Sequence, residues 1–267
     1  METKHIIILT LILLTSGCVD QIGEPGQSQA GQKGLEIEEF SITDDRLRPE
    51  QNAVITARFK NYHRDIEVHT VEIFNEGSNL DVSKNGCTPS IGELESARKN
   101  VYPEMQCTWT VKAPGQETLE GFRERSEPVK LRASYSGSLE NKESLKAEFR
   151  SITDIEKTSR ISRVFSNGEI EARMTTETPI AKNSGNSIEL QVRNEGPGRI
   201  EGPYSFEYTP SSVFEGCDSE ASPSIGSEWS TVCTLSSGSE GVRNLFFSTD
   251  YKYIKEPNLD ITVVNRR

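Results

Sequence analysis

The sequence repeats itself, and this repeat restricts the possible folds more than any other feature of the 267 residues. Five landmarks recur in the same order: a strand-like segment that ends on Asn, a Gly-Cys pair, a Pro-Ser-Ile-Gly run, a Cys-Thr pair and two late apolar segments. They lie first at 52–61, 86–87, 89–92, 107–108 and 131–149, and again at 186–194, 216–217, 223–226, 233–234 and 245–263. We therefore predict two copies of one domain, over residues 35–152 and 153–267.

Each copy has the pattern of an all-β domain. Apolar and polar residues alternate, as half-buried antiparallel strands require, at Ala53, Ile55, Ala57 and Phe59. Turn formers interrupt such segments at hairpin-like intervals. Seven or so short strands in about 110 residues indicate a β-sandwich in each copy. Residues 35–42 are expected to form the lead-in strand of the first copy, and 155–178 a lead-in strand and hairpin of the second.

Four cysteines fall two to a copy: Cys87 and Cys107, then Cys217 and Cys233. Four cysteines allow three pairings, and the repeat favours pairing within each copy. A disulfide closing a loop of this length contributes roughly 3 kcal/mol in the chain-entropy model. Metal binding is the competing interpretation, but these spacings lack the CxxC or His pairs of zinc sites.

The fifth cysteine, Cys18, follows an apolar run from Ile6 to Leu14 that has a Lys before it and small residues after it. This pattern is typical of a signal peptide, here residues 1–17, and predicts export of the chain. The run is shorter than the roughly 20 residues that cross a bilayer. A leader cut elsewhere, with Cys18 incidental, and an uncleaved signal anchor are the alternatives.

The residues Thr15-Ser16-Gly17-Cys18 resemble the lipobox of prokaryotic lipoproteins, with Thr15 where that motif usually has Leu, Val or Ile. The resemblance implies cleavage before Cys18 and attachment of lipid to it. Residues 18–34 then form the lipidated cysteine and a linker rich in Gly and Gln. A coil of this length and composition has a root-mean-square reach of roughly 20–25 Å, so we expect a flexible tether.

The strand ends at Phe59-Lys60-Asn61 and Val192-Arg193-Asn194, followed late in each copy by Tyr-containing strands, resemble CARDB-like, immunoglobulin-type domains. Such domains occur in prokaryotic, including archaeal, surface lipoproteins. The resemblance implies two tandem immunoglobulin-like β-sandwiches. Trp109 and Trp229 lie on opposite sides of their nearest cysteines, so both are expected to be ordinary core residues.

The charge and motifs exclude several functions. The formal net charge of -11 repels phosphate backbones, so nucleic acid is not an expected partner and the membrane is expected to be contacted through lipid alone. No catalytic motif is found, and we predict no enzymatic activity, no cofactor and no metal. His63 and His69 lie six residues apart and could meet, but two exposed histidines are ordinary. The carboxylates lack the spacing of a calcium loop, which leaves only weak calcium binding open.

The leading hypothesis is a lipid-anchored protein on the outer face of the cytoplasmic membrane or the cell surface, acting in adhesion, envelope structure or protein assembly. Its partner would be another protein or an envelope component. Candidate binding regions are residues 79–102 and 214–231. The alternative is a solute- or carbohydrate-binding lipoprotein, which would require an aromatic-lined cleft between the two copies.

Overall fold

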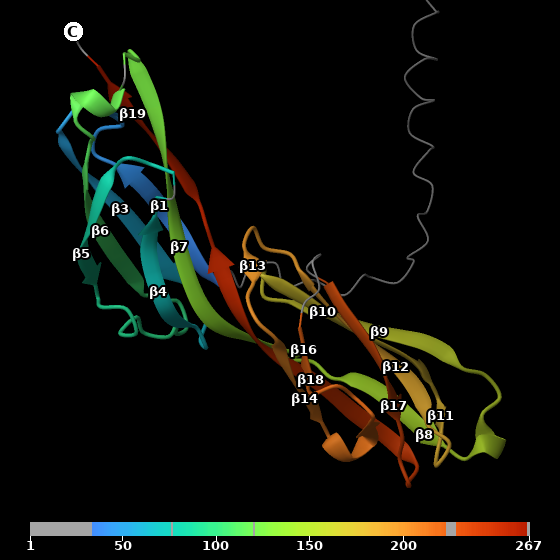
Figure 1. The fold of residues 1–267 in the computed structure, drawn as a ribbon. Coiled ribbons are helices and arrows are strands. Elements are labelled where there is room, and N and C mark those ends of the chain that lie inside the picture. The colour runs from blue at the N-terminus through green and yellow to red at the C-terminus, as the bar shows by residue number, and fades with distance from the viewer. Residues whose placement is uncertain (1–33, 76, 120, 223–227, 266–267) are drawn as a thin grey trace, which may run out of the picture.

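The computed structural model describes residues 34–75, 77–119, 121–222 and 228–265, and these form an all-β protein with three short 3₁₀ helices. Its sheets divide into a first and a second lobe, joined end to end (Figure 1). Among the described residues, no helix is both long and apolar enough to span a membrane. The signal peptide, Cys18 and most of the predicted linker lie outside the described residues.

The first lobe has two sheets. One is a four-stranded antiparallel sheet in the order β1-β3-β6-β5, with strands Leu35–Ile42, Asn52–Asn61, Glu104–Lys112 and Asp81–Thr88. The other runs β4-β7-β19-β2, with strands Glu67–Phe74, Glu124–Glu140, Asn258–Val264 and Arg46–Leu47. The buried residues of both sheets, such as Ile55, Trp109 and Leu131, belong to one apolar core.

The second lobe also has an antiparallel sheet and a second group of strands. Its antiparallel sheet runs β15-β17-β12-β10-β9, with strands Phe214–Glu215, Glu228–Leu235, Asn186–Asn194, Ile170–Thr178 and Ser159–Ser166. The other strands gather around β18: Gly241–Lys255 for β18 itself, Leu145–Arg150 for β8, Ile180–Ala181 for β11, Arg199–Ile200 for β13, Tyr204–Thr209 for β14 and Glu220–Ala221 for β16. The predicted lead-in hairpin is confirmed as the antiparallel pair β9 and β10.

Two long strands, β7 and β18, run from one lobe into the other (Figure 1). They pair with each other in the middle of the molecule, Ala133 opposite Lys255 and Glu140 opposite Ser248. One sheet of each lobe is therefore part of a single ten-stranded sheet that passes through both.

The final strand of each sequence copy pairs in the opposite lobe. Strand β8 directly follows β7 but pairs with β18, whereas β19 follows β18 but pairs with β7. The predicted domain boundary at residue 152 stays a prediction. Strand β8, before the boundary, pairs with β18 after it, and β19, after the boundary, pairs with β7 before it. Pro257 supplies a physical reason for β19: a residue before proline is held extended, and a proline cannot adopt the positive φ of the favoured tight hairpin turns. The chain therefore continues along β7, with Asn258 opposite Lys130.

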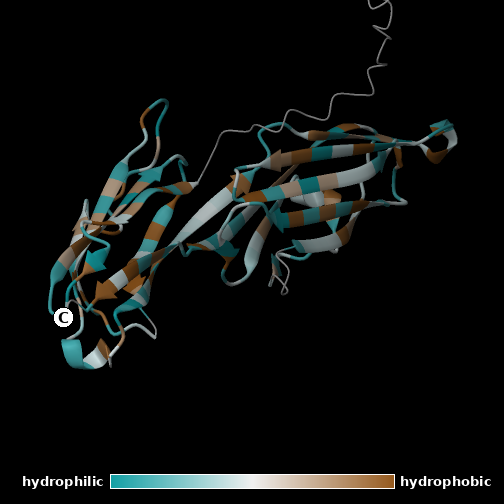
Figure 2. Ribbon diagram, turned by 90° about the horizontal axis from the view of Figure 1, so that it is seen from above, coloured by the Kyte–Doolittle hydropathy of each residue, from teal (hydrophilic) through white to brown (hydrophobic). Residues whose placement is uncertain are grey.

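The predicted strand alternation agrees with the observed burial. Along β3 the alternating apolar side chains are buried, and Phe59 is fully enclosed. Bands of opposite hydropathy alternate along many strands of both lobes (Figure 2). Trp109 is buried, whereas Trp229 is half-buried and stacks on Phe206 with a ring-centroid distance of 4.2 Å.

Both disulfides join cysteines of the same copy. Cys87 on β5 lies directly opposite Cys107 on β6, and the two are bonded. Cys217, just after β15, is bonded to Cys233 on β17. In each lobe the bond ties an outer segment of the antiparallel sheet to the next strand inward, which limits fraying at that edge. Two disulfides are typical of an oxidising, extracytoplasmic location.

Candidate functional site

A cluster of buried polar side chains lies where the lobes meet. We call it the waist cluster, and it consists of Tyr135, Asn167, Glu169, Tyr251 and Lys255. Its centre is the Glu169 carboxylate, with only 1% of the residue exposed. Burying a carboxylate is costly unless charges or hydrogen bonds compensate it, so its partners define the site.

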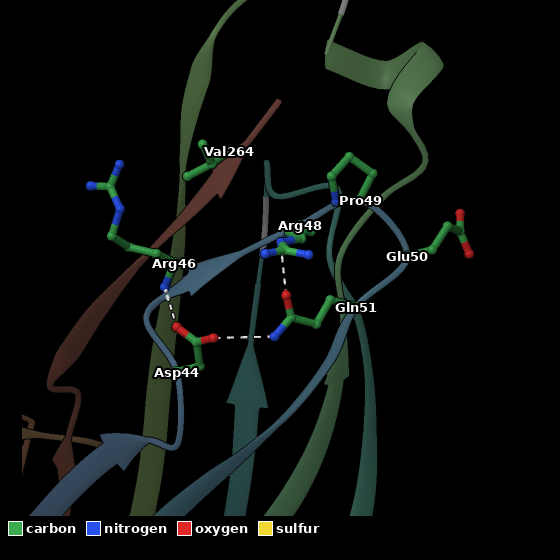
Figure 3. Close-up of a pocket in the computed structure, with 7 residues that line it drawn as sticks. All are labelled: Asp44, Arg46, Arg48, Pro49, Glu50, Gln51 and Val264. Atoms are coloured by element: carbon green, nitrogen blue, oxygen red, sulfur yellow. Dashed lines mark hydrogen bonds between the residues drawn. The ribbon is translucent and has the colours of Figure 1, made fainter. Parts of the chain in front are cut away.

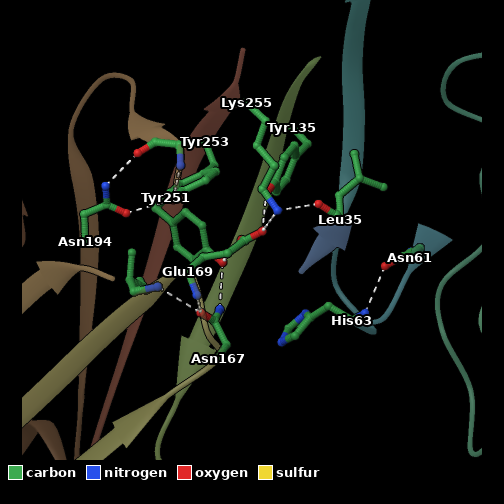
Figure 4. Close-up of polar contacts among 12 residues, drawn as sticks. Leu35, Asn61, His63, Tyr135, Asn167, Glu169, Asn194, Tyr251, Tyr253 and Lys255 are labelled. Carbon is green, nitrogen blue, oxygen red and sulfur yellow. Dashed lines mark hydrogen bonds and ion pairs between the residues drawn. The ribbon is translucent and has the colours of Figure 1, made fainter. Parts of the chain in front are cut away.

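Three side chains bind the Glu169 carboxylate (Figure 4). The Tyr251 hydroxyl donates to Oε2 at 2.8 Å, and the Tyr135 hydroxyl donates to Oε1. The Lys255 ammonium lies 3.3 Å from Oε1 and also donates to the Leu35 carbonyl at the start of β1. The cluster thereby joins a turn of the second lobe, both long strands and the first strand of the first lobe.

The turn between β9 and β10 places Glu169 in this position. The Asn167 side-chain oxygen accepts hydrogen bonds from the backbone N–H groups of Glu169 and Ile170, each at 3.1 Å. Gly168 between them has φ +82°, a conformation that glycine adopts without strain. The Asn167 amide also donates to the Tyr251 hydroxyl at 2.7 Å. The turn and the cluster therefore stabilise each other.

The electrostatics of the cluster keep its tyrosines protonated. Burial raises the pKa of Tyr135 well above 10, and the negative charge of Glu169 adds to the effect. The pKa of Tyr251 is raised for the same reasons. Both hydroxyls therefore remain donors at neutral pH. Because the side chains of the cluster bind one another, the arrangement is suited to holding the lobes together.

Tyr253 extends the same contact region along β18. Its hydroxyl donates to the Asn194 side chain at 2.9 Å and accepts from the Gly198 N–H at 3.0 Å. A Cβ atom on Gly198 would lie 2.4 Å from the Tyr253 ring. The residues from Asn194 to Gly198, which the sequence shows only as a turn signal, therefore pack closely against the Tyr253 ring.

The two histidines have separate partners. His63 Nδ1 accepts a hydrogen bond from the Asp65 N–H at 3.2 Å, and burial lowers the pKa of His63. His69 Nε2 lies 2.6 Å from the Ser136 hydroxyl. Within the described parts of the chain, no three His, Cys, Asp or Glu residues are arranged to hold a metal ion.

An open polar hollow of about 670 Å³ lies at the far end of the first lobe, lined by Asp44, Arg46, Arg48, Pro49, Glu50, Gln51 and Val264 (Figure 3). Asp44 accepts from the Arg46 N–H at 3.0 Å and from the Gln51 amide at 3.1 Å. Arg46 pairs with Glu124 outside the hollow, at 2.7 Å. Asp44, Arg46 and Gln51 therefore already have partners.

The first predicted binding region, residues 79–102, ends in an exposed apolar feature. Val101 is 59% and Tyr102 43% exposed, and the Tyr102 ring lies 4.8 Å from the Tyr62 ring. We call Tyr62, Val101 and Tyr102 the aromatic patch. The second region, 214–231, includes residues 223–227, which lie outside the described residues.

The cysteine pairs follow from the sequence, but the waist cluster does not, and the two predicted binding regions stay predictions. Glu169 looks like an ordinary solvated residue after an Asn-Gly turn, and Tyr135 and Tyr251 look like core aromatics. Comparison with protein-family models, with curated proteins and with solved structures finds no match for this chain.

Proposed function

We propose that the protein is a non-enzymatic, lipid-anchored surface protein whose two immunoglobulin-like β-sandwiches act in adhesion, envelope structure or protein assembly. The lipobox-like residues before Cys18, the signal-peptide pattern and the CARDB-like motifs support this proposal. The two disulfides support an extracytoplasmic location.

The observation that carries the proposal is the strand exchange between the lobes. Each lobe is completed by a strand from the other half of the chain, so the lobes cannot separate without breaking a sheet. An elongated body that resists separation is suited to a structural or adhesive role, because such a protein must transmit load between its attachment and its partner.

The aromatic patch is the proposed partner-binding surface. Tyr102 is exposed and Tyr62 is half-buried. Tyrosine side chains contribute large contact areas at little entropic cost and are enriched at interfaces. Lys60 lies 5.9 Å from the Tyr62 ring and forms ion pairs with Glu38 at 3.3 Å and Glu104 at 3.0 Å. An apolar centre beside charged groups is the usual composition of a protein interface.

The alternative, a solute- or carbohydrate-binding lipoprotein, requires a cleft at the junction. The junction does contain tyrosines, but Tyr135, Tyr251 and Tyr253 are 0%, 4% and 0% exposed and pack against Glu169 or Asn194. These contacts favour a filled joint and weigh against a ligand site at this position.

Affinity capture of the intact protein from its native envelope tests the proposal, with mass spectrometry of both the partners and the N-terminal peptide. We expect an envelope protein to be captured by the wild type and capture to fall at least about tenfold for Y102A, as for a residue at the centre of an interface. V232A is the matched control, because Val232 is 63% exposed in the second lobe.

Two outcomes would contradict the proposal. Equal capture by Y102A and the wild type would remove the aromatic patch as the binding surface. An N-terminal peptide that does not begin at a lipidated Cys18 would remove the membrane anchor.

A further inference from the structure

The waist cluster lies against the first described residues of the chain. The Gly34 carbonyl accepts a hydrogen bond from the Tyr62 N–H at 3.1 Å, and the next carbonyl, that of Leu35, accepts from Lys255. Gly34 itself touches Glu169: a Cβ atom on Gly34 would lie within 2.5 Å of three atoms of the Glu169 carboxyl group. The Gly34–Leu35 segment, the rest of the first lobe and the second lobe thus meet around one buried carboxylate.

Few strands connect the lobes through the junction. Strands β7 and β18 pair with each other there and form a ribbon. Strand β4 flanks β7 on the side of the first lobe, and β13 and β14 flank β18 on the side of the second lobe. Because none of these flanking strands extends along the whole ribbon, the ribbon can still twist between the lobes. The cluster adds side chains that attach the β9–β10 turn and the start of β1 to this ribbon.

From these contacts we infer that Glu169 is the positioning residue that holds the two lobes at one fixed angle, and that the Gly34–Leu35 segment is part of this lock. Glu169 has this role because its two oxygens are bound by groups from β7 and β18, while Lys255 links it to Leu35. When the carboxylate is removed, Lys255 loses its buried counter-charge and the turn loses its attachment to the ribbon. The lobes then sample a range of angles.

Distances between spin labels in the two lobes test this inference in the full-length protein. Residues 122 and 152 are suitable positions, because Phe122 and Ile152 are 61% and 70% exposed. Phe122 lies just before the part of β7 that pairs with β19 in the first lobe, and Ile152 lies just after β8 in the second lobe. We expect one narrow distance distribution for the wild type. We expect E169Q and G34A each to broaden it or add a second population.

E127Q is the matched control. Glu127 is also 1% exposed, but its carboxylate binds Asn79 at 2.9 and 3.1 Å and Arg125 at 2.9 Å, all within the first lobe. E127Q should lower thermal stability without changing the width of the distribution.

The distance widths decide the outcome, with circular dichroism used to select conditions under which every variant is folded. A distribution for folded E169Q as narrow as that of the wild type would overturn the inference, because the ribbon alone would then set the angle. Equal broadening in E127Q would also overturn it, because general destabilisation would then explain the effect.

Discussion

Tyr204 places a polar group in the core without a visible partner. Its residue is fully buried, and its hydroxyl has no hydrogen-bond partner among the described residues. The ring stacks on Phe206 at a centroid distance of 5.9 Å. The ring therefore contributes packing, while the hydroxyl bears an uncompensated desolvation cost.

The variant Y204F should keep the packing and remove this cost. We expect its free energy of unfolding to stay equal or rise by about 1 kcal/mol, as measured by denaturant titration. A clear loss of stability would show that the hydroxyl has a partner and would contradict this account.

The same variant should change the alkaline limit of stability. Burial raises the pKa of Tyr204 to about 12, above its ordinary value of 10.0. The folded protein therefore holds the Tyr204 proton more tightly than the unfolded chain does. The resulting contribution to the free energy of unfolding is fully present below the ordinary pKa of tyrosine, and it is lost as the pH rises through the pKa of the folded state. Unfolding curves between these two pH values should show a smaller loss for Y204F than for the wild type, with Tyr135 and Tyr251 accounting for a remaining loss.

At the scale of elements, the outer strands of the antiparallel sheets carry features that oppose pairing with other chains. The pairing of β1 with β3 is interrupted between Ile37 and Glu39, and that of β5 with β6 between Lys84 and Gly86. Strand β9 pairs without interruption, but its Arg163 lies opposite the buried Met174 and thus on the inner face, where it pairs with Glu143. An inward charge on an edge strand discourages a further strand from adding to it.

Replacing Arg163 should therefore expose the edge of the second lobe. The variant R163V creates a continuous apolar inner row with Ile161 and Phe165, and we expect faster aggregation, measured by light scattering at raised concentration. R160V is the control, because Arg160 lies on the opposite face of the same strand. If the two variants aggregate equally, the inward position of the charge is not what protects the edge.

Element by element, the sequence predicts most of what is local. Period-two alternation gives β3 and β12, and the repeat gives the cysteine pairs, because both depend on neighbouring residues or on self-comparison. Local sequence does not determine the lobe in which β8 and β19 pair, because an alternating strand buries its apolar side equally well in either lobe. Only Pro257 signals the exchange, by opposing a tight β18–β19 turn. Glu169 could not be found either, because its burial depends on Tyr135 and Tyr251, which are distant in sequence.

At the scale of the whole molecule, the exchange makes the two halves of the chain interdependent. The first lobe depends on β19, an inner strand that comes from the second half of the chain and carries the buried Ile261 and Val263. The second lobe in turn depends on β8, with the buried Ala147 and Phe149. Neither half has a complete set of sheets of its own.

Cutting the connection between the halves should therefore leave them together. A protease site placed at residues 156–158, which are exposed, allows the folded protein to be cut after β8. We expect both fragments to elute as one particle in gel filtration and to separate only in denaturant, since each supplies a strand to the other. Separation of the fragments in native buffer would show that the exchanged strands do not hold the halves together.

The position of Gly34 determines where an anchored molecule would be attached. Gly34 lies at the waist, beside Glu169 and Lys255, and not at the far end of either lobe. With lipid on Cys18, the linker would therefore join the body near its middle. A flexible linker would leave both far ends of the body free to turn toward the bilayer or toward a partner.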